Sequence, residues 1–160
     1  MELTFFFDAS SLPLSFSYFF AGGPQPKTKK ELQEWIKECD GGVKNHGEPN
    51  TWDVTLVTDM SYLFYDMKNF NEPIDQWNTS EVTNMSNMFA GALSFNQPIM
   101  MDTSKVTDMS NMFCAASSFN QPITMDTSKV TDMSGMFAGA DAMTHPLPQT
   151  KEMIAVSNFF

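Results

Sequence analysis

The 160-residue chain contains no arginine, and all nine of its basic residues are lysines. It has 19 acidic residues, which gives a formal net charge of −10. Arginine makes most bidentate contacts to phosphate and to base edges, and phosphate neutralisation dominates affinity for nucleic acid. An acidic chain without arginine is therefore predicted not to bind nucleic acid. Anionic membrane surfaces are disfavoured for the same reason.

Cysteine and histidine are also scarce. Cys39 and Cys114 lie in different segments and form no CxxC pair, which favours two buried free thiols. His46 and His145 belong to no nucleophile–base motif, and with the cysteines they would not make a strong zinc site. No glycine-rich phosphate loop is present. The sequence thus predicts a protein that is not an enzyme, with no cofactor and no metal.

No apolar run is long and unbroken enough to span a bilayer, so no integral membrane segment is predicted. Residues 3–20 are rich in Phe, Leu and Ser and faintly resemble a secretory signal peptide. However, Glu2 and Asp8 stand where such a signal is positively charged, and Pro13 interrupts the apolar part. Residues 1–26 are interpreted as a leader or as an N-terminal extension.

One pattern occurs four times in the chain. The central valines of the four copies are Val57, Val82, Val106 and Val130, at steps of 25, 24 and 24 residues. Periods of about 20 to 29 residues are typical of leucine-rich-repeat solenoids. Because one repeat cannot bury its apolar face alone, the repeats are expected to stack.

Each repeat has two halves with different apolar periods. Met109, Met112, Phe113 and Ala116 recur at helical spacing, which predicts a short helix in the second half. The first half alternates apolar and polar residues around Ile99 and Ile123, which predicts a short strand. The predicted core residues are Met85, Met88, Phe89, Phe95, Ile99, Met109, Met112, Phe113, Phe119, Ile123, Met133 and Phe137.

The predicted fold is an α/β repeat solenoid with a helical N-terminal cap. It is a right-handed, leucine-rich-repeat-like coil with one short strand and one short helix per repeat of 24–25 residues. A capping box at Thr28–Glu31 and helical apolar spacing place the cap at residues 27–51. The four-coil solenoid follows at residues 52–148. Residues 149–160 form a tail in which no full C-terminal cap is evident, so self-association through the last coil is left open.

These residues resemble the BspA-like leucine-rich-repeat surface proteins. That family carries a repeat that reads W-D-[TV]-S-x-V-T-x-M-S-x-M-F-x-x-A-x-x-F-N-Q-P-I, and the match here runs from Trp52 to Pro148. Met101 and Met125 replace the tryptophan, and Met143 begins a degenerate last motif. The resemblance implies surface display and contact with proteins or cell surfaces. It implies no substrate.

Polar residues at equivalent positions are predicted to form ladders from one repeat to the next. Stacked oxygens could bind calcium, and threonine arrays could order water on ice or a mineral, but capping and turn hydrogen bonds are favoured. One acidic ladder is Asp59, Asn84, Asp108 and Asp132, and the other is Asp53, Asn78, Asp102 and Asp126. The threonine ladders are Thr79, Thr103 and Thr127, and Thr58, Thr83, Thr107 and Thr131.

Two functions from different classes remain open. The first is a protein-interaction module, displayed on a cell surface or secreted, that recognises or adheres to another protein or a cell-surface component. The second is a structural or assembly subunit of an intracellular or organellar complex. For the first, the predicted interaction surface is Asp53, Asn78, Asp102, Asp126 and Thr124. Residues 52–148 contain 11 acidic residues and 3 lysines, so the predicted partner meets an acidic array.

Overall fold

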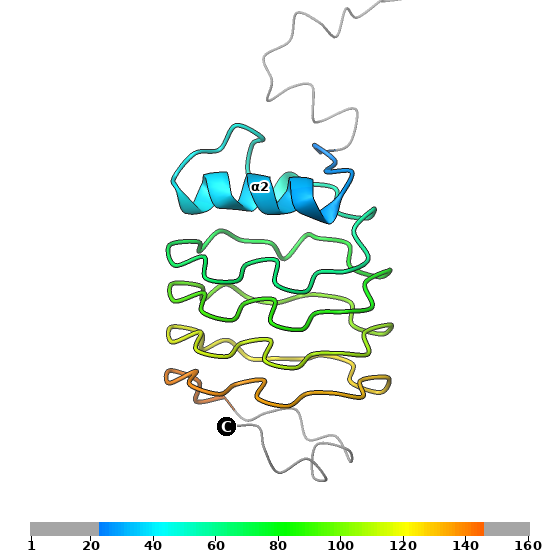
Figure 1. Ribbon diagram of the computed structural model, residues 1–160, viewed down its shortest axis with the longest axis vertical. Coiled ribbons are helices and arrows are strands. Elements are labelled where there is room, and N and C mark those ends of the chain that lie inside the picture. The colour runs from blue at the N-terminus through cyan, green and yellow to red at the C-terminus, as the bar shows by residue number, and fades with distance from the viewer. Residues whose placement is uncertain (1–22, 146–160) are drawn as a thin grey trace, which may run out of the picture.

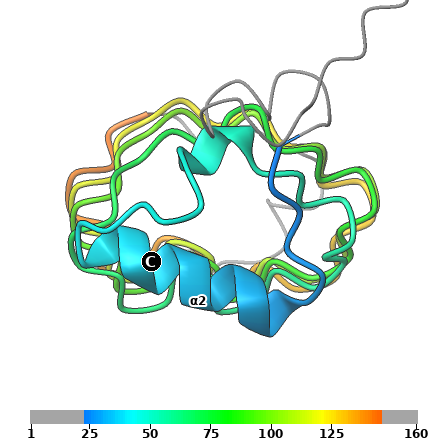
Figure 2. The same cartoon turned by 90° about the horizontal axis from the view of Figure 1, so that it is seen from above.

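Residues 23–145 are the part of the chain that the computed structural model describes. Within them, the helices are α2, Lys29–Asp40, and the 3-10 helix η2, Pro49–Thr51. The rest of the chain winds into coils that stack on one another, and α2 lies across one end of the stack (Figure 1). Seen along the stack, the coils superimpose (Figure 2). Most of the predicted leader and the predicted tail lie outside the described residues.

Helix α2 begins at a capping box. The Thr28 hydroxyl accepts a hydrogen bond from the Glu31 N–H at 3.2 Å, and the Glu31 carboxylate accepts one from the Lys27 N–H at 2.8 Å. Its buried side chains, Leu32, Trp35, Ile36 and Cys39, join the same apolar cluster as the coils. The amphipathic face of the helix therefore closes one end of the stack.

The second half of each repeat does not form the predicted short helix. It forms successive tight turns, in which the Leu63 N–H donates to the Met60 carbonyl at 3.3 Å and the Met67 N–H donates to the Phe64 carbonyl at 3.1 Å. The turns require left-handed backbone at two positions in each coil. These residues have φ between 53° and 73°: Tyr62, Asp66, Asn87, Gly91, Asn111, Ala115, Gly135 and Gly139. The apolar side chains that predicted a helix still point inward, because two such turns keep the same residues on one face.

The turns leave every second N–H free to reach the next coil. The N–H groups of Met60, Tyr62, Phe64 and Asp66 donate to the carbonyls of Asn84, Ser86, Met88 and Ala90 at 2.8–3.0 Å. Parallel bridges join Asp59, Asn84, Asp108 and Asp132 in the same region. An α-helix would have used these N–H groups within its own turn. The half predicted as a helix is therefore the half that joins neighbouring coils through the backbone.

The half predicted as a strand forms no regular strand within residues 23–145. Its side chains do alternate, since Ile99 and Met101 are buried and Met100 between them is exposed. Here the coils are joined by side chains: the Thr79 hydroxyl donates to the Asp102 carbonyl at 3.0 Å. Assignment of the stack to the right-handed, leucine-rich-repeat-like class stays a prediction.

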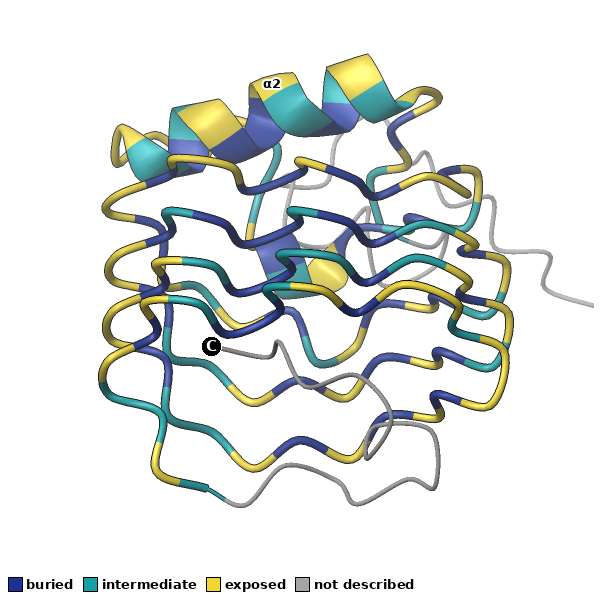
Figure 3. Ribbon diagram, turned by 60° about the horizontal axis from the view of Figure 1, so that its bottom comes forward, coloured by how far each residue is buried: buried dark blue, intermediate teal, exposed yellow. Residues whose placement is uncertain are grey.

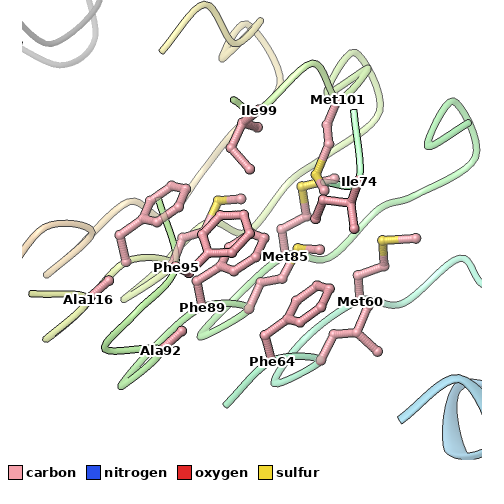
Figure 4. Close-up of a cluster of buried hydrophobic side chains, with 14 of the residues drawn as sticks. Met60, Phe64, Ile74, Met85, Phe89, Ala92, Phe95, Ile99, Met101 and Ala116 are labelled. Carbon is pink, nitrogen blue, oxygen red and sulfur yellow. The ribbon is translucent and has the colours of Figure 1, made fainter. Parts of the chain in front are cut away.

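The interior of the stack consists of columns of equivalent apolar side chains. Buried and exposed residues alternate around every coil (Figure 3), and all twelve predicted core residues are buried. The Phe64, Phe89, Phe113 and Phe137 rings lie nearly parallel, with centroids 4.8, 5.3 and 5.6 Å apart. Figure 4 shows Phe64 and Phe89 beside the methionines that pack with them.

Phe113 is fully buried between two phenylalanine neighbours of its column, so truncation leaves a cavity that rigid coils cannot close. We expect Phe113→Ala to lower the free energy of unfolding by about 3–5 kcal/mol, measured by urea denaturation. Ser117→Ala, at an exposed position of the same coil, is the control and should change it little. An unchanged midpoint for Phe113→Ala would contradict this packing.

Ala115 is a non-glycine residue at φ 55°, where the other repeats carry glycine or aspartate. Left-handed backbone costs an alanine roughly 1–2 kcal/mol, and glycine in return loses about 0.5–1 kcal/mol of chain entropy. Ala115→Gly is therefore expected to raise the free energy of unfolding, by up to about 1 kcal/mol. The adjacent Ala116→Gly, at a buried position without positive φ, should lower it.

Candidate interaction surface

The ladder predicted as the interaction surface is present at equivalent positions of the four coils. In each coil a side-chain oxygen accepts a hydrogen bond from the N–H two residues further on, at 2.9–3.1 Å. The acceptors are Asp53, Asn78, Asp102 and Asp126, and the donors are Thr55, Ser80, Ser104 and Ser128. These bonds make Asx turns. Each turn fixes the direction in which its carboxylate or amide points.

Exposure divides this ladder into one covered member and three open ones. Asp53 is half-buried, and its second oxygen accepts a hydrogen bond from the Gln25 amide at 2.6 Å. Asn78, Asp102 and Asp126 are exposed, as is Thr124. We call Asn78, Asp102, Thr124 and Asp126 the ladder face. The N-terminal segment covers the first-coil end of the ladder and leaves the ladder face open.

The carboxylates of the ladder face are held in their charged form. The hydrogen bond from the Ser104 N–H lowers the pKa of Asp102, and the one from the Ser128 N–H lowers the pKa of Asp126. The nearby charge of Asp102 acts in the opposite direction on Asp126. The two carboxylates lie on neighbouring coils and repel each other, but both stay ionised at neutral pH.

The second acidic ladder has a structural role. Asp59, Asn84, Asp108 and Asp132 accept hydrogen bonds at 2.8–2.9 Å from the N–H groups of Ser61, Ser86, Ser110 and Ser134. The sequence led us to expect helix caps here, and the same side chains cap turns instead. Asp59 also forms an ion pair with Lys29 of α2, at 3.0 Å.

Most members of the two threonine ladders donate their hydroxyls to a carbonyl of a neighbouring coil, namely Thr79, Thr83, Thr103, Thr107 and Thr131. Thr79, Thr103 and Thr127 are buried, so this column cannot present its hydroxyls to ice or to a mineral surface. The other column is more open, but Thr107 and Thr131 donate their hydroxyls to the preceding coil's carbonyls at 3.2 and 3.0 Å. Both columns therefore serve cohesion of the stack.

The scarce cysteines and histidines are dispersed. Burial raises the pKa of the Cys39 thiol to about 11, which keeps it protonated, and Cys114 lies half-buried in another coil. His46 stacks on Trp35 with ring centroids 4.1 Å apart, so it belongs to the cap. Within residues 23–145, no three His, Cys, Asp or Glu side chains gather as a metal site would require.

Two exposed apolar features escaped the sequence analysis. Met100 is 67% exposed on the same side as Thr124, and Tyr62 and Tyr65 of the first coil are exposed with ring centroids 5.6 Å apart. The exposure of Met100 could have been predicted, because it alternates with Met101, which was expected to point inward. Tyr62 and Tyr65 align with Asn87 and Ala90 of the second coil. An alignment of the repeats therefore shows that the first coil differs at these two positions.

The family comparison matches residues 30–151 to a family described as "Mycoplasma protein of unknown function, DUF285". The chain belongs to the DUF285 family. DUF285 membership spans α2 from its second residue and continues through the repeats, and it is consistent with the resemblance to BspA-like repeat proteins. No curated protein and no solved structure matches this DUF285 chain. No helix between residues 23 and 145 has the length and apolarity needed to cross a bilayer.

The lowered pKa values of Asp102 and Asp126 make stability depend on pH. A carboxyl whose pKa is lower in the folded chain stabilises it above the unfolded pKa, about 3.9, and this contribution is lost as pH falls through the folded pKa. We expect the stability of the native chain to fall more steeply below about pH 4 than that of Asp102→Asn/Asp126→Asn. Urea midpoints across pH 2–6 measure this.

The second coil provides the reciprocal control. Asn78 makes the same Asx turn without a charge, so Asn78→Asp adds a carboxylate in the same setting. This variant should steepen the loss of stability in acid. Parallel pH profiles for all three chains would contradict the assignment.

Proposed function

We propose that the chain is a non-enzymatic protein-interaction module of the BspA-like, leucine-rich-repeat type, displayed on a cell surface or secreted, and that the ladder face is its recognition surface. The observation that carries the proposal is the rigid orientation of Asp102 and Asp126. Each is exposed, and each is fixed by a hydrogen bond of 2.9 Å within its own turn. Groups held in place before binding lose little entropy when a partner docks.

Charge decides what kind of partner suits this face. Residues 52–148 carry a formal charge of −8, and Asp102 and Asp126 lie on the open part of the surface. Such a field accelerates encounter with a positively charged surface and repels acidic ones. Thr124 and the exposed Met100 add a hydroxyl and an apolar contact beside the carboxylates. The partner we propose is therefore a basic protein surface.

A second candidate function is a structural or assembly subunit of an intracellular or organellar complex, held through its capped end. The observation that favours it is the exposed pair Tyr62 and Tyr65. The Tyr62 carbonyl accepts a hydrogen bond from Gln33 of α2, so the pair lies beside the cap. Aromatic side chains are enriched in protein interfaces.

Capture from native extract with variants of equal charge separates these functions. The test variant is Asp102→Asn/Asp126→Asn, which keeps each Asx turn, as Asn78 does in the second coil. The control is Asp108→Asn/Asp132→Asn, which removes the same charge from the turn-capping ladder. Quantitative mass spectrometry should find partners that the first variant loses and the second retains.

Retention of all partners by Asp102→Asn/Asp126→Asn would rule out the ladder face as the recognition surface. If both double variants retain the same partners and Tyr62→Ser/Tyr65→Ser loses them, the assembly function is supported instead. Raising the salt concentration should slow association of the native chain with a basic partner more than that of Asp102→Asn/Asp126→Asn.

A further inference from the structure

The end of the stack opposite α2 presents a row of hydrogen-bond donors. In the third coil, the N–H groups of Asn111, Phe113 and Ala115 donate to the fourth coil's carbonyls at 2.7–2.8 Å. The fourth coil repeats the same turns, with positive φ at Gly135 and Gly139. Its N–H groups at Met133, Gly135, Phe137 and Gly139 therefore point away from the stack.

A buried hydroxyl marks the same end. The hydroxyls of Thr79 and Thr103 each donate to a carbonyl of the following coil, at 3.0 and 2.9 Å. Thr127 occupies the equivalent position in the fourth coil, where it is only 4% exposed and its hydroxyl has no hydrogen-bond partner. A buried hydroxyl without a partner is unfavourable, because it has lost its hydrogen bonds to water without gaining others. By analogy with Thr79 and Thr103, the Thr127 hydroxyl would be satisfied by a carbonyl of one further coil.

The apolar columns are also less covered at this end. Val130 and Met143 are partly buried, whereas the residues above them, Val106 and Phe119, are fully buried. Hydrogen bonding and packing therefore agree that the fourth coil is shaped to receive another coil, which must present carbonyls in parallel register.

A second copy of the chain fits this end poorly. The opposite end of the stack is occupied by α2, which already serves the first coil through Lys29 to Asp59 and through Asp40 to the N–H groups of Asn69 and Phe70. Two copies that meet through their fourth coils would place N–H groups against N–H groups. The donors would then remain unpaired.

The chain itself carries a segment with the required pattern. Residues 156–160 read Val-Ser-Asn-Phe-Phe, which parallels Met-Ser-Asn-Met-Phe at residues 109–113. In this alignment Asn158 falls at the left-handed position, which Asn87 and Asn111 occupy in earlier coils. Thr150 aligns with Thr127, and the family match also continues past the fourth coil, to residue 151.

We propose that residues 149–160 are the segment of this chain that docks on this end of the stack. In the register of the alignment, Gln149, Ser157 and Phe159 stand at the positions of Asp126, Ser134 and Met136, whose carbonyls accept hydrogen bonds from the third coil. Val156 stands at the position of Met109 and Met133. The segment covers an edge that would otherwise accept a foreign chain, as exposed donor rows do.

Amide hydrogen exchange on the full chain tests this register. We expect Gly135 and Phe137 to exchange within about tenfold of Asn111 and Phe113, their equivalents in the third coil. Val156→Asp places a charge in the apolar column and should speed exchange at Gly135 by at least about tenfold. Lys151→Asp introduces the same residue at a position aligned with exposed Ser128, and it should leave Gly135 protected.

Asn87 reports whether the rest of the stack remains folded in each variant, because its N–H pairs between the second and third coils. If Val156→Asp also exposes Asn87, the milder Val156→Ala replaces it. The proposal fails if Gly135 exchanges at the unprotected rate in the unmodified chain. It also fails if Gly135 is protected only at concentrations where the chain dimerises, since the occupant would then be a second copy.

Discussion

The interaction on which the structure depends is the backbone hydrogen bond from one coil's turns to the next coil's carbonyls. It fixes the path length of a coil, because any residue inserted into the turns would shift every later pair. The chain does contain one insertion, since the first step is 25 residues and the others are 24. The extra residue lies near Asp75, where no backbone ladder runs and Asn50 bridges the chain by side-chain hydrogen bonds to Asp75 and Gln76.

The same constraint explains how α2 serves as a cap. A first coil needs partners for groups that would otherwise meet a preceding coil, and a helix has no free backbone donors along its middle. Side chains of α2 supply the missing partners instead, some as donors and some as acceptors. Asp40 accepts hydrogen bonds from the N–H groups of Asn69 and Phe70, as Asn71 accepts one from Asn96 in the next coil. Lys29 reaches Asp59 and Ser61 in the same way.

The sequence was sufficient to predict which residues lie inside, but it did not predict the backbone of the turns. Met109, Met112 and Phe113 are buried in the structure, since inward positions follow from apolar spacing whichever backbone carries them. Spacing cannot tell where an N–H group points, and so a double turn was predicted as a helix. Glycine has poor helix propensity, so Gly135 and Gly139 within the expected helix were the signal against it. The ladder that contains Asp102 and Asp126 was predictable because the repeat spacing fixes equivalent positions, whereas the exposure of Met100 depends on local alternation.

The two acidic ladders show which property of their side chains the turns require. Asn78 and Asn84 accept the same N–H hydrogen bonds as the aspartates of the other coils, so the turns need an oxygen and do not need a charge. A carboxylate at Asp126 moreover lies in the repulsive field of Asp102. The fold nevertheless stabilises both charges, because the hydrogen bonds of the Asx turns and the nearby Lys105 and Lys129 lower the pKa values of Asp102 and Asp126. The turns alone do not explain why aspartate rather than asparagine stands at these two positions, and the cationic partner that we propose would interact with both charges.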